Sequence, residues 1–313
     1  MSLSPIVAII LCCITSYVHA RNFQTTRFRD RVFPTVTIEQ NISFKSHLPG
    51  GAKKKYFLLD LYQPQNDTLP LRPLILWMHG GGFKFGNKTS RGTPIWCRRF
   101  AERGYVCAAV NYRLSKKHTL SDFNALKEAC ANAVEDIFEA VAFFKLHHRQ
   151  YRIDTNKIIL AGNSAGAMIA LQAVYSNPTL IRQEGKNGFN KTIAVRNPIH
   201  ISAIVNFWGG IFDPDWLKNA HVPIVSVHGS KDNIVPPNQP EKGIYGSTLI
   251  HRYADSFHIP NRLKIFEGYA HELQKHFNPL WAGKATLRRL EEAGQIAASF
   301  LYEELFTNRT AFR

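Results

Sequence analysis

Short apolar segments alternate with helix-like segments along most of this 313-residue chain. The apolar segments are rich in β-branched residues and short enough to be buried strands. They are residues 55–62, 74–78, 106–112, 157–161, 201–207, 224–227 and 263–266. The helix-like segments are residues 93–101, 126–148, 164–175, 248–257 and 284–306. This alternation predicts an α/β fold, a mostly parallel sheet with helices on both faces, and the residues before Leu74 could add antiparallel strands at one edge.

The first twenty residues differ from the rest of the chain. Residues 6–18 are uncharged and mostly apolar, a run too short to span a membrane, and Ala20 supplies a small residue for a cleavage site. We therefore predict a secretory signal peptide over residues 1–20, one domain over residues 21–313, and a secreted or periplasmic location. No Lys or Arg precedes Ile6, so a buried apolar N-terminal segment is the alternative. No later apolar run is long enough for a transmembrane segment.

The chain is strongly basic, with 39 Lys and Arg against 23 Asp and Glu and a formal net charge of +16. Such a charge favours anionic partners such as nucleic acid, acidic polysaccharide or a membrane surface. The basic residues are dispersed, however, and no zinc-finger spacing, basic arm or aromatic RNA-binding signature accompanies them. We interpret the charge as a solvated basic surface and expect no nucleic-acid partner.

Three cysteines remain after removal of the predicted signal: Cys97, Cys107 and Cys130. With an odd number, at most one disulfide can form within the chain. Cys107 lies in an apolar run, where a thiol usually acts as a small buried hydrophobe. We find no metal-binding pattern. Glycosylation sequons, which carry meaning only in a eukaryotic secretory pathway, begin at Asn41, Asn66, Asn87, Asn190 and Asn308.

The sequence Gly162-Asn163-Ser164-Ala165-Gly166 directly follows a predicted strand and opens a predicted helix. This is the context of a nucleophile elbow, a turn so tight that only small side chains fit beside the serine. The turn would hold the Ser164 hydroxyl exposed above the sheet. A plain glycine-rich turn with a capping serine is the alternative.

A second glycine-rich segment, His79-Gly80-Gly81-Gly82-Phe83, follows the predicted strand at residues 74–78. Glycines here would let backbone N–H groups approach a reacting carbonyl without obstruction by side chains. The amides of Gly81, Gly82 and Ala165 are our candidates for an oxyanion hole. We predict that His79 anchors the loop and is not a base. An ordinary glycine turn is the alternative.

A serine hydroxyl needs a base, and the base needs an orienting group. Asp232 follows one predicted strand and His271 follows the next, so both fall at strand ends in the order Ser, Asp, His. Asp213 and Asp215 are rivals for the acid, because they follow the strand at residues 201–207. We favour Asp232, which we expect on the strand end beside the nucleophile-bearing half of the site.

These motifs resemble those of α/β-hydrolases of the carboxylesterase and lipase group, particularly secreted bacterial esterases with a feruloyl-esterase-like (BD-FAE) domain. Residues 110–114, 136–144 and 152–154 are similar to the layout of that family, and the resemblance covers nearly all of residues 21–313. It implies an eight-stranded sheet, a triad of Ser164, Asp232 and His271, and no cofactor. Hormone-sensitive-lipase-like relatives more often have Asp where this chain has Asn163, which leaves the subfamily open.

We therefore interpret the chain as a secreted serine esterase that forms an acyl-enzyme on a small-molecule or sugar-linked ester. It has no long apolar insertion like a lipase lid, so we expect a preference for short acyl chains or for aryl and sugar esters. Two alternatives stay open: a serine peptidase or amidase of the same fold, and a non-catalytic binding protein on that scaffold. The oligomeric state and the acyl and alcohol specificity do not follow from the sequence.

Overall fold

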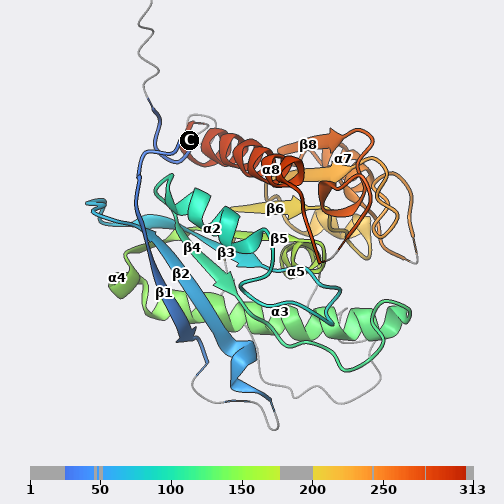
Figure 1. Ribbon diagram of the computed structural model, residues 1–313, viewed down its shortest axis with the longest axis horizontal. Helices are drawn as coiled ribbons and strands as arrows, with labels where there is room; N and C mark the ends of the chain where they lie inside the picture. Colours follow the sequence, from blue (N-terminus) through green and yellow to red (C-terminus); the bar gives the residue numbers. More distant parts are fainter. Residues whose placement is uncertain are drawn as a thin grey trace, which may run out of the picture.

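The computed structural model describes residues 25–45, 48, 52–176, 200–241, 243–278 and 280–307. It contains one eight-stranded sheet in the order β1-β2-β4-β3-β5-β6-β7-β8 (Figure 1). The strands are β1 (Val36–Ser43), β2 (Leu58–Pro64), β3 (Arg72–Met78), β4 (Val106–Val110), β5 (Ile153–Asn163), β6 (Ala203–Phe207), β7 (Ile224–Gly229) and β8 (Asn261–Phe266). Strands β3 to β8 run parallel, whereas β1 and β2 pair antiparallel at one edge. The predicted α/β fold with its antiparallel edge is confirmed.

Helices cover both faces of this sheet (Figure 1). The α-helices are α2 (Thr93–Ala101), α3 (Phe123–Leu146), α4 (His148–Tyr151), α5 (Ala165–Tyr175), α7 (Ser247–Ser256) and α8 (Lys284–Tyr302). Shorter helical turns are η1 (Lys54–Phe57), η2 (Pro214–Asn219), η3 (His271–Leu273) and η4 (Glu303–Thr307). Successive side chains of a strand point to opposite faces, so Leu76 packs in the core beneath α3 and α5 while Trp77 packs beneath α2 and α8.

Among the element boundaries that differ from the sequence prediction, two have a clear local cause. Residues 55–57 were predicted to begin a strand, but they belong to the helical turn η1. This turn exposes Lys53, Lys54 and Lys55 and still buries Phe57, whereas an extended strand would send alternate residues inward. Helix α3 begins at Phe123, three residues earlier than predicted, because the Asp122 carboxylate accepts hydrogen bonds from the amides of Asn124 and Ala125.

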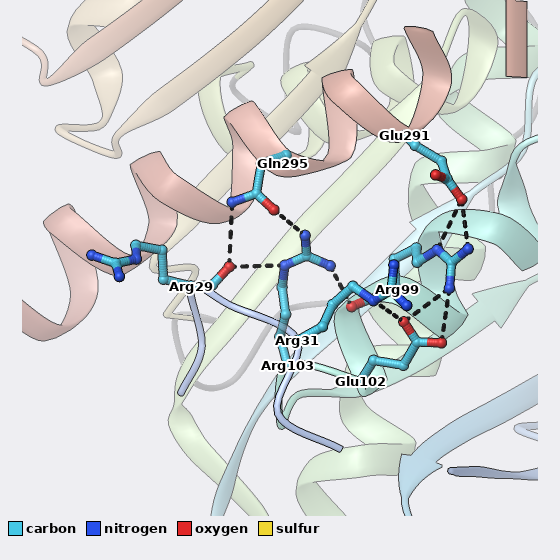
Figure 2. Close-up of polar contacts among 7 residues, drawn as sticks. All are labelled: Arg29, Arg31, Arg99, Glu102, Arg103, Glu291 and Gln295. Carbon is cyan, nitrogen blue, oxygen red and sulfur yellow. Dashed lines mark hydrogen bonds and ion pairs between the residues drawn. The ribbon is translucent and has the colours of Figure 1, made fainter. Parts of the chain in front are cut away.

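The segment that precedes β1 is held against α2 and α8 by a group of seven residues, here called the arginine cluster (Figure 2). Its members are Arg29, Arg31, Arg99, Glu102, Arg103, Glu291 and Gln295. Arg103 is buried and donates to the carbonyl oxygens of Arg29 (3.0 Å) and Arg99 (2.7 Å) and to the side chain of Gln295. Glu102 pairs with Arg31 at 2.8 Å and with Arg99 at 3.0 Å.

Backbone bonds reinforce this attachment. The amides of Val32 and Phe33 both donate to the carbonyl oxygen of Glu102, and the Phe28 amide donates to that of Arg103. Residues from about 26 onward are therefore part of the folded domain. The predicted signal peptide, residues 1–20, lies outside the described residues and stays a prediction.

The three cysteines of the domain are all buried, and all three thiols are free. Burial raises the pKa of Cys130 and of Cys97, which favours the neutral thiol.

In the described part of the chain, no helix is both long and apolar enough to cross a membrane.

Candidate active site

Ser164 lies at the sharp turn between β5 and α5, with φ 52° and ψ −121°. A non-glycine residue rarely adopts a positive φ, and such strain is common at functional sites. The two flanking glycines permit the turn. A Cβ on Gly162 would lie 2.3 Å from the carbonyl carbon of Gly166, and a Cβ on Gly166 would lie 2.1 Å from the carbonyl oxygen of Met78. The backbone therefore passes itself too closely for any larger residue at either position.

The structure brings Ser164, Asp232 and His271 together in one hydrogen-bonded chain. Nε2 of His271 lies 2.9 Å from Oγ of Ser164, and Nδ1 lies 2.7 Å from Oδ2 of Asp232. His271 and Asp232 are buried, while Ser164 is partly exposed. This is the geometry in which an imidazole can take a proton from a serine hydroxyl while a carboxylate orients the ring.

The Asp232 carboxylate is held in its charged form. Its Oδ1 accepts hydrogen bonds from the amides of Ile234 (2.9 Å) and Val235 (3.0 Å). Burial by itself would raise the pKa of Asp232, but the side chains of His228 and His271 hold it well below the usual value. The carboxylate is therefore negative at neutral pH and can stabilise an imidazolium at His271.

The rival acid has a different role in the structure. Asp213 is the N-cap of η2, and its Oδ1 accepts a hydrogen bond from the amide of Asp215 at 2.9 Å. Helix capping accounts for this carboxylate. The position next to His271 is taken by Asp232.

The glycine-rich loop lies directly against the serine, since a Cβ on Gly80 would be 3.3 Å from Cβ of Ser164. Gly81 has φ 118° and Gly82 has φ 60°, conformations that favour glycine. Among the described residues, the amides of Gly81, Gly82 and Ala165 donate no hydrogen bond. Amides that are unpaired beside a nucleophile are the donors that an oxyanion hole requires.

His79 lies beneath this loop rather than at the serine. Its Nδ1 is 2.7 Å from the carbonyl oxygen of Gly80, and its ring stacks on Tyr112 with centroids 4.3 Å apart. The Tyr112 hydroxyl donates to the carbonyl oxygen of His79 at 2.7 Å. Burial lowers the pKa of His79 to about 4, so the ring is neutral at pH 7. As predicted, His79 anchors the loop.

Two exposed apolar side chains lie close to the catalytic groups. The Phe277 ring packs edge-on against His271 with centroids 5.3 Å apart, and Leu120 reaches to within 2.4 Å of where a Cβ on Gly82 would lie. Both side chains are exposed, as is Trp281 four residues after Phe277. The surface beside the catalytic groups is therefore partly apolar.

Sequence reasoning missed one residue that touches this chain. His228 is fully buried, and its Nε2 lies 3.2 Å from Oδ2 of Asp232, the oxygen that also faces His271. Its spacing, four residues before Asp232, was visible in the sequence. The direction of its side chain was not, because that depends on the end of β7 packing against α7.

No cluster of His, Cys, Asp or Glu that could hold a metal ion is present in the part of the chain that the structure describes.

Comparisons with known proteins agree with this architecture. The BD-FAE family model matches residues 59–214. A probable carboxylic ester hydrolase, LipM of Mycobacterium tuberculosis, is 28% identical over 169 residues, which are 53% of this chain and 34% of that protein. Arylacetamide deacetylase of Bos taurus is 28% identical over 193 residues, 53% of this chain and 46% of that protein. The chain thus spans less than half the length of these two relatives.

Solved structures with this fold are also similar. Thermogutta terrifontis esterase 2 phosphorylated by paraoxon has a TM-score of 0.58 and 22% identity, and the match covers 87% of this chain and 95% of that one. An inhibited esterase B of Lactobacillus rhamnosis has a TM-score of 0.55 and 16% identity over 95% of this chain and 98% of that one. At these identities the likeness shows the fold.

Proposed function

We propose that this chain, which has the α/β-hydrolase fold and matches the BD-FAE family model over residues 59–214, is a serine esterase that hydrolyses carboxylic esters. One observation carries the proposal: the unbroken chain from Asp232 through His271 to Ser164, with bonds of 2.7 and 2.9 Å. The ester hydrolases and esterases among its relatives support the same reaction class.

The reaction proceeds by acyl transfer. Nε2 of His271 takes the proton of Ser164 as Oγ attacks the ester carbonyl, and Asp232 stabilises the imidazolium that forms. Negative charge develops on the carbonyl oxygen as Oγ attacks. The amides of Gly81, Gly82 and Ala165 stabilise this charge by donating hydrogen bonds to that oxygen. The imidazolium then protonates the leaving alcohol, which departs and leaves an acyl-enzyme. A water molecule, deprotonated by His271, releases the acid by the same steps in reverse.

The substrate of this reaction is a small-molecule or sugar-linked ester. The exposed apolar side chains of Phe277 and Leu120 beside the catalytic groups favour an acyl or aryl group that is itself apolar. Every role in the proposed reaction is filled by side chains and backbone amides of the chain, so the mechanism calls on no cofactor. A short acyl chain remains our expectation, to be checked by comparing acetate, butyrate and long-chain esters of one alcohol.

The proposal includes export. The segment that begins near residue 26 is anchored by the arginine cluster. Cleavage after Ala20 would therefore remove none of the residues that anchor it. Mass spectrometry of the exported protein is expected to find a start near Arg21. An intact Met1 in a soluble cytosolic pool would refute secretion.

The covalent step can be tested directly. A fluorophosphonate probe is expected to label Ser164, and Ser164→Ala is expected to lose labelling and to lower kcat by roughly three orders of magnitude or more. Ser202→Ala is the matched control, because the Ser202 hydroxyl donates to the carbonyl oxygen of Asn156 and the residue is partly exposed. Undiminished labelling of the Ser164→Ala variant would show that Ser164 is not the nucleophile. Faster turnover of an amide than of its matched ester would favour the peptidase alternative.

A further inference from the structure

A second histidine lies behind the acid of the proposed triad. His228 is the penultimate residue of β7, and none of its surface is exposed. Its Nε2 faces two oxygens, Oδ2 of Asp232 at 3.2 Å and the carbonyl oxygen of Val235 at 2.8 Å. Because both of these atoms are acceptors, Nε2 must carry a hydrogen.

The other ring nitrogen is fixed by a chain of polar side chains within the core. Nδ1 of His228 lies 2.6 Å from Oγ of Ser247, the first residue of α7. Nδ2 of Asn206 donates to that same Oγ at 3.2 Å and to Oγ of Ser226 at 2.9 Å. Since Oγ of Ser247 already accepts from Asn206, its own hydrogen is available for Nδ1. Every partner is then satisfied when His228 is neutral with its hydrogen on Nε2.

Oδ2 of Asp232 thus faces two imidazole rings, while Oδ1 takes two backbone amides. Nδ1 of His271 lies 2.7 Å from Oδ2, and Nε2 of His228, whose hydrogen bond goes to the carbonyl oxygen of Val235, lies 3.2 Å from it. We infer that His228 is a positioning residue of the active site: its Nε2–H binds the carbonyl oxygen of Val235, whose amide binds Oδ1 of Asp232, and lies 3.2 Å from Oδ2, so it holds the carboxylate in place for His271. The inference rests on the proposed function, because it assigns His228 a role in the same acyl transfer.

The N–H of His228 near the Asp232 carboxylate also affects the protonation of His271. Without the hydrogen on Nε2 of His228 near Oδ2, the charge of the Asp232 carboxylate is less offset, and a stronger negative charge beside His271 favours the imidazolium form. Removal of the His228 N–H is therefore expected to move the acid limb of the pH profile of kcat/KM to higher pH. The other ionisable groups near His271 are Glu272 and Arg91, and the other near His228 is His251.

Two variants separate positioning from packing. His228→Leu removes both ring nitrogens, whereas His228→Gln keeps an amide N–H near the place of Nε2. Hydrolysis of a chromogenic short-chain ester is measured from pH 5 to 9, with the fraction of active enzyme counted by fluorophosphonate titration. The matched control is His251→Leu. His251 is also a buried histidine, in the neighbouring helix α7, but its Nδ1 contacts Oδ1 of Asn261, at 2.6 Å, instead of Asp232.

His228→Leu is expected to lower kcat/KM roughly tenfold, about the value of one hydrogen bond, and to move the acid limb to higher pH. His228→Gln is expected to restore most of the rate and the position of the limb, and His251→Leu is expected to leave the limb in place. Should His228→Leu not fold, Ser247→Ala replaces it, because loss of that hydroxyl removes the partner of Nδ1 that holds the ring, and a smaller shift of the acid limb in the same direction is expected.

Distinct results would overturn the two claims. A wild-type rate and an unmoved acid limb in His228→Leu, or equal behaviour of the Leu and Gln variants, would show that His228 only fills space. Absence of fluorophosphonate labelling in the wild-type protein would instead remove the proposed function itself.

Discussion

Two polar clusters of this molecule are both well bonded, yet they are built for different purposes. One runs from Ser164 through His271 and Asp232 to His228, at the ends of β5, β7 and β8. The other is the arginine cluster, which ties the N-terminal segment to α2 and α8 (Figure 2). Imidazole changes its protonation state near neutral pH, whereas a guanidinium keeps its charge. Even the buried Arg103, whose pKa burial lowers to about 10, stays charged at pH 7.

The backbone distinguishes the two clusters as well. The first cluster ends on a partly exposed serine at positive φ, whereas α2 and α8, which carry Arg99 and Gln295 of the second, are regular helices. Burial and hydrogen bonding alone therefore do not mark an active site. An active site is marked by a hydrogen-bonded series of titratable side chains that ends on a strained, accessible nucleophile. Changes in the first cluster should lower the rate and spare stability, and changes in the second should do the reverse.

The largest effect is expected at the acid. Asp232→Asn keeps the shape of the side chain but favours the wrong tautomer of His271, a change that costs roughly ten-thousand-fold in kcat in serine proteases. Steady-state kinetics on a short-chain ester measure this loss, and circular dichroism checks that the variant folds. Asp213→Asn is the matched control and should retain most activity. The opposite pattern would transfer the acid role to Asp213.

The next effect concerns pH. Burial lowers the pKa of His79 and of His251 from 6.5 to about 4 in the folded protein. Between these values the unfolded chain binds protons that the folded chain does not, so stability falls as the pH falls. From pH 7 to pH 5 we expect a loss of about 2 kcal/mol for each histidine, measured by urea unfolding. His251→Leu should remove about half of this dependence, and a flat profile would contradict it.

A smaller effect is expected from Arg103→Met. The change leaves the carbonyl oxygens of Arg29 and Arg99 without this donor, which should cost about 2 kcal/mol of unfolding free energy. Specific activity at 25 °C should stay near that of the wild type. Arg98→Met, at an exposed position of the preceding helix α2, is the control and should change stability little. A loss of activity without a loss of stability would break the distinction between the two clusters.

The smallest effect is expected from Arg31→Ala. Its guanidinium pairs with Glu102 at 2.8 Å, but half of its side chain is exposed, and Arg99 also binds Glu102. Exposed pairs contribute about 0.2–1 kcal/mol, so the midpoint of thermal unfolding should move by only a few degrees at most. A larger shift would mean that the N-terminal segment depends on this single pair.

Much of the fold follows from the sequence because buried strands of a parallel sheet are apolar throughout. Strands β3 and β4 are buried along their whole length, and the apolar runs predicted them closely. Strand β1 was not located, because it lies at the edge, is mostly exposed and carries a bulge near Asn41. An edge strand with polar residues has no continuous apolar run to reveal it.

The sequence by itself determined the local geometry of the site. The glycines at positions 81, 82, 162 and 166 are required by positive φ or by close backbone contact, and such restrictions act over a few bonds. Tertiary structure decided which distant groups meet. His271 reaches a serine 107 residues away, and Asp232 meets both His271 and His228 only because β7 and β8 end side by side. Hydrogen bonds of this kind depend on where packed strands end and which way side chains point, and no residue pattern along the chain encodes that direction.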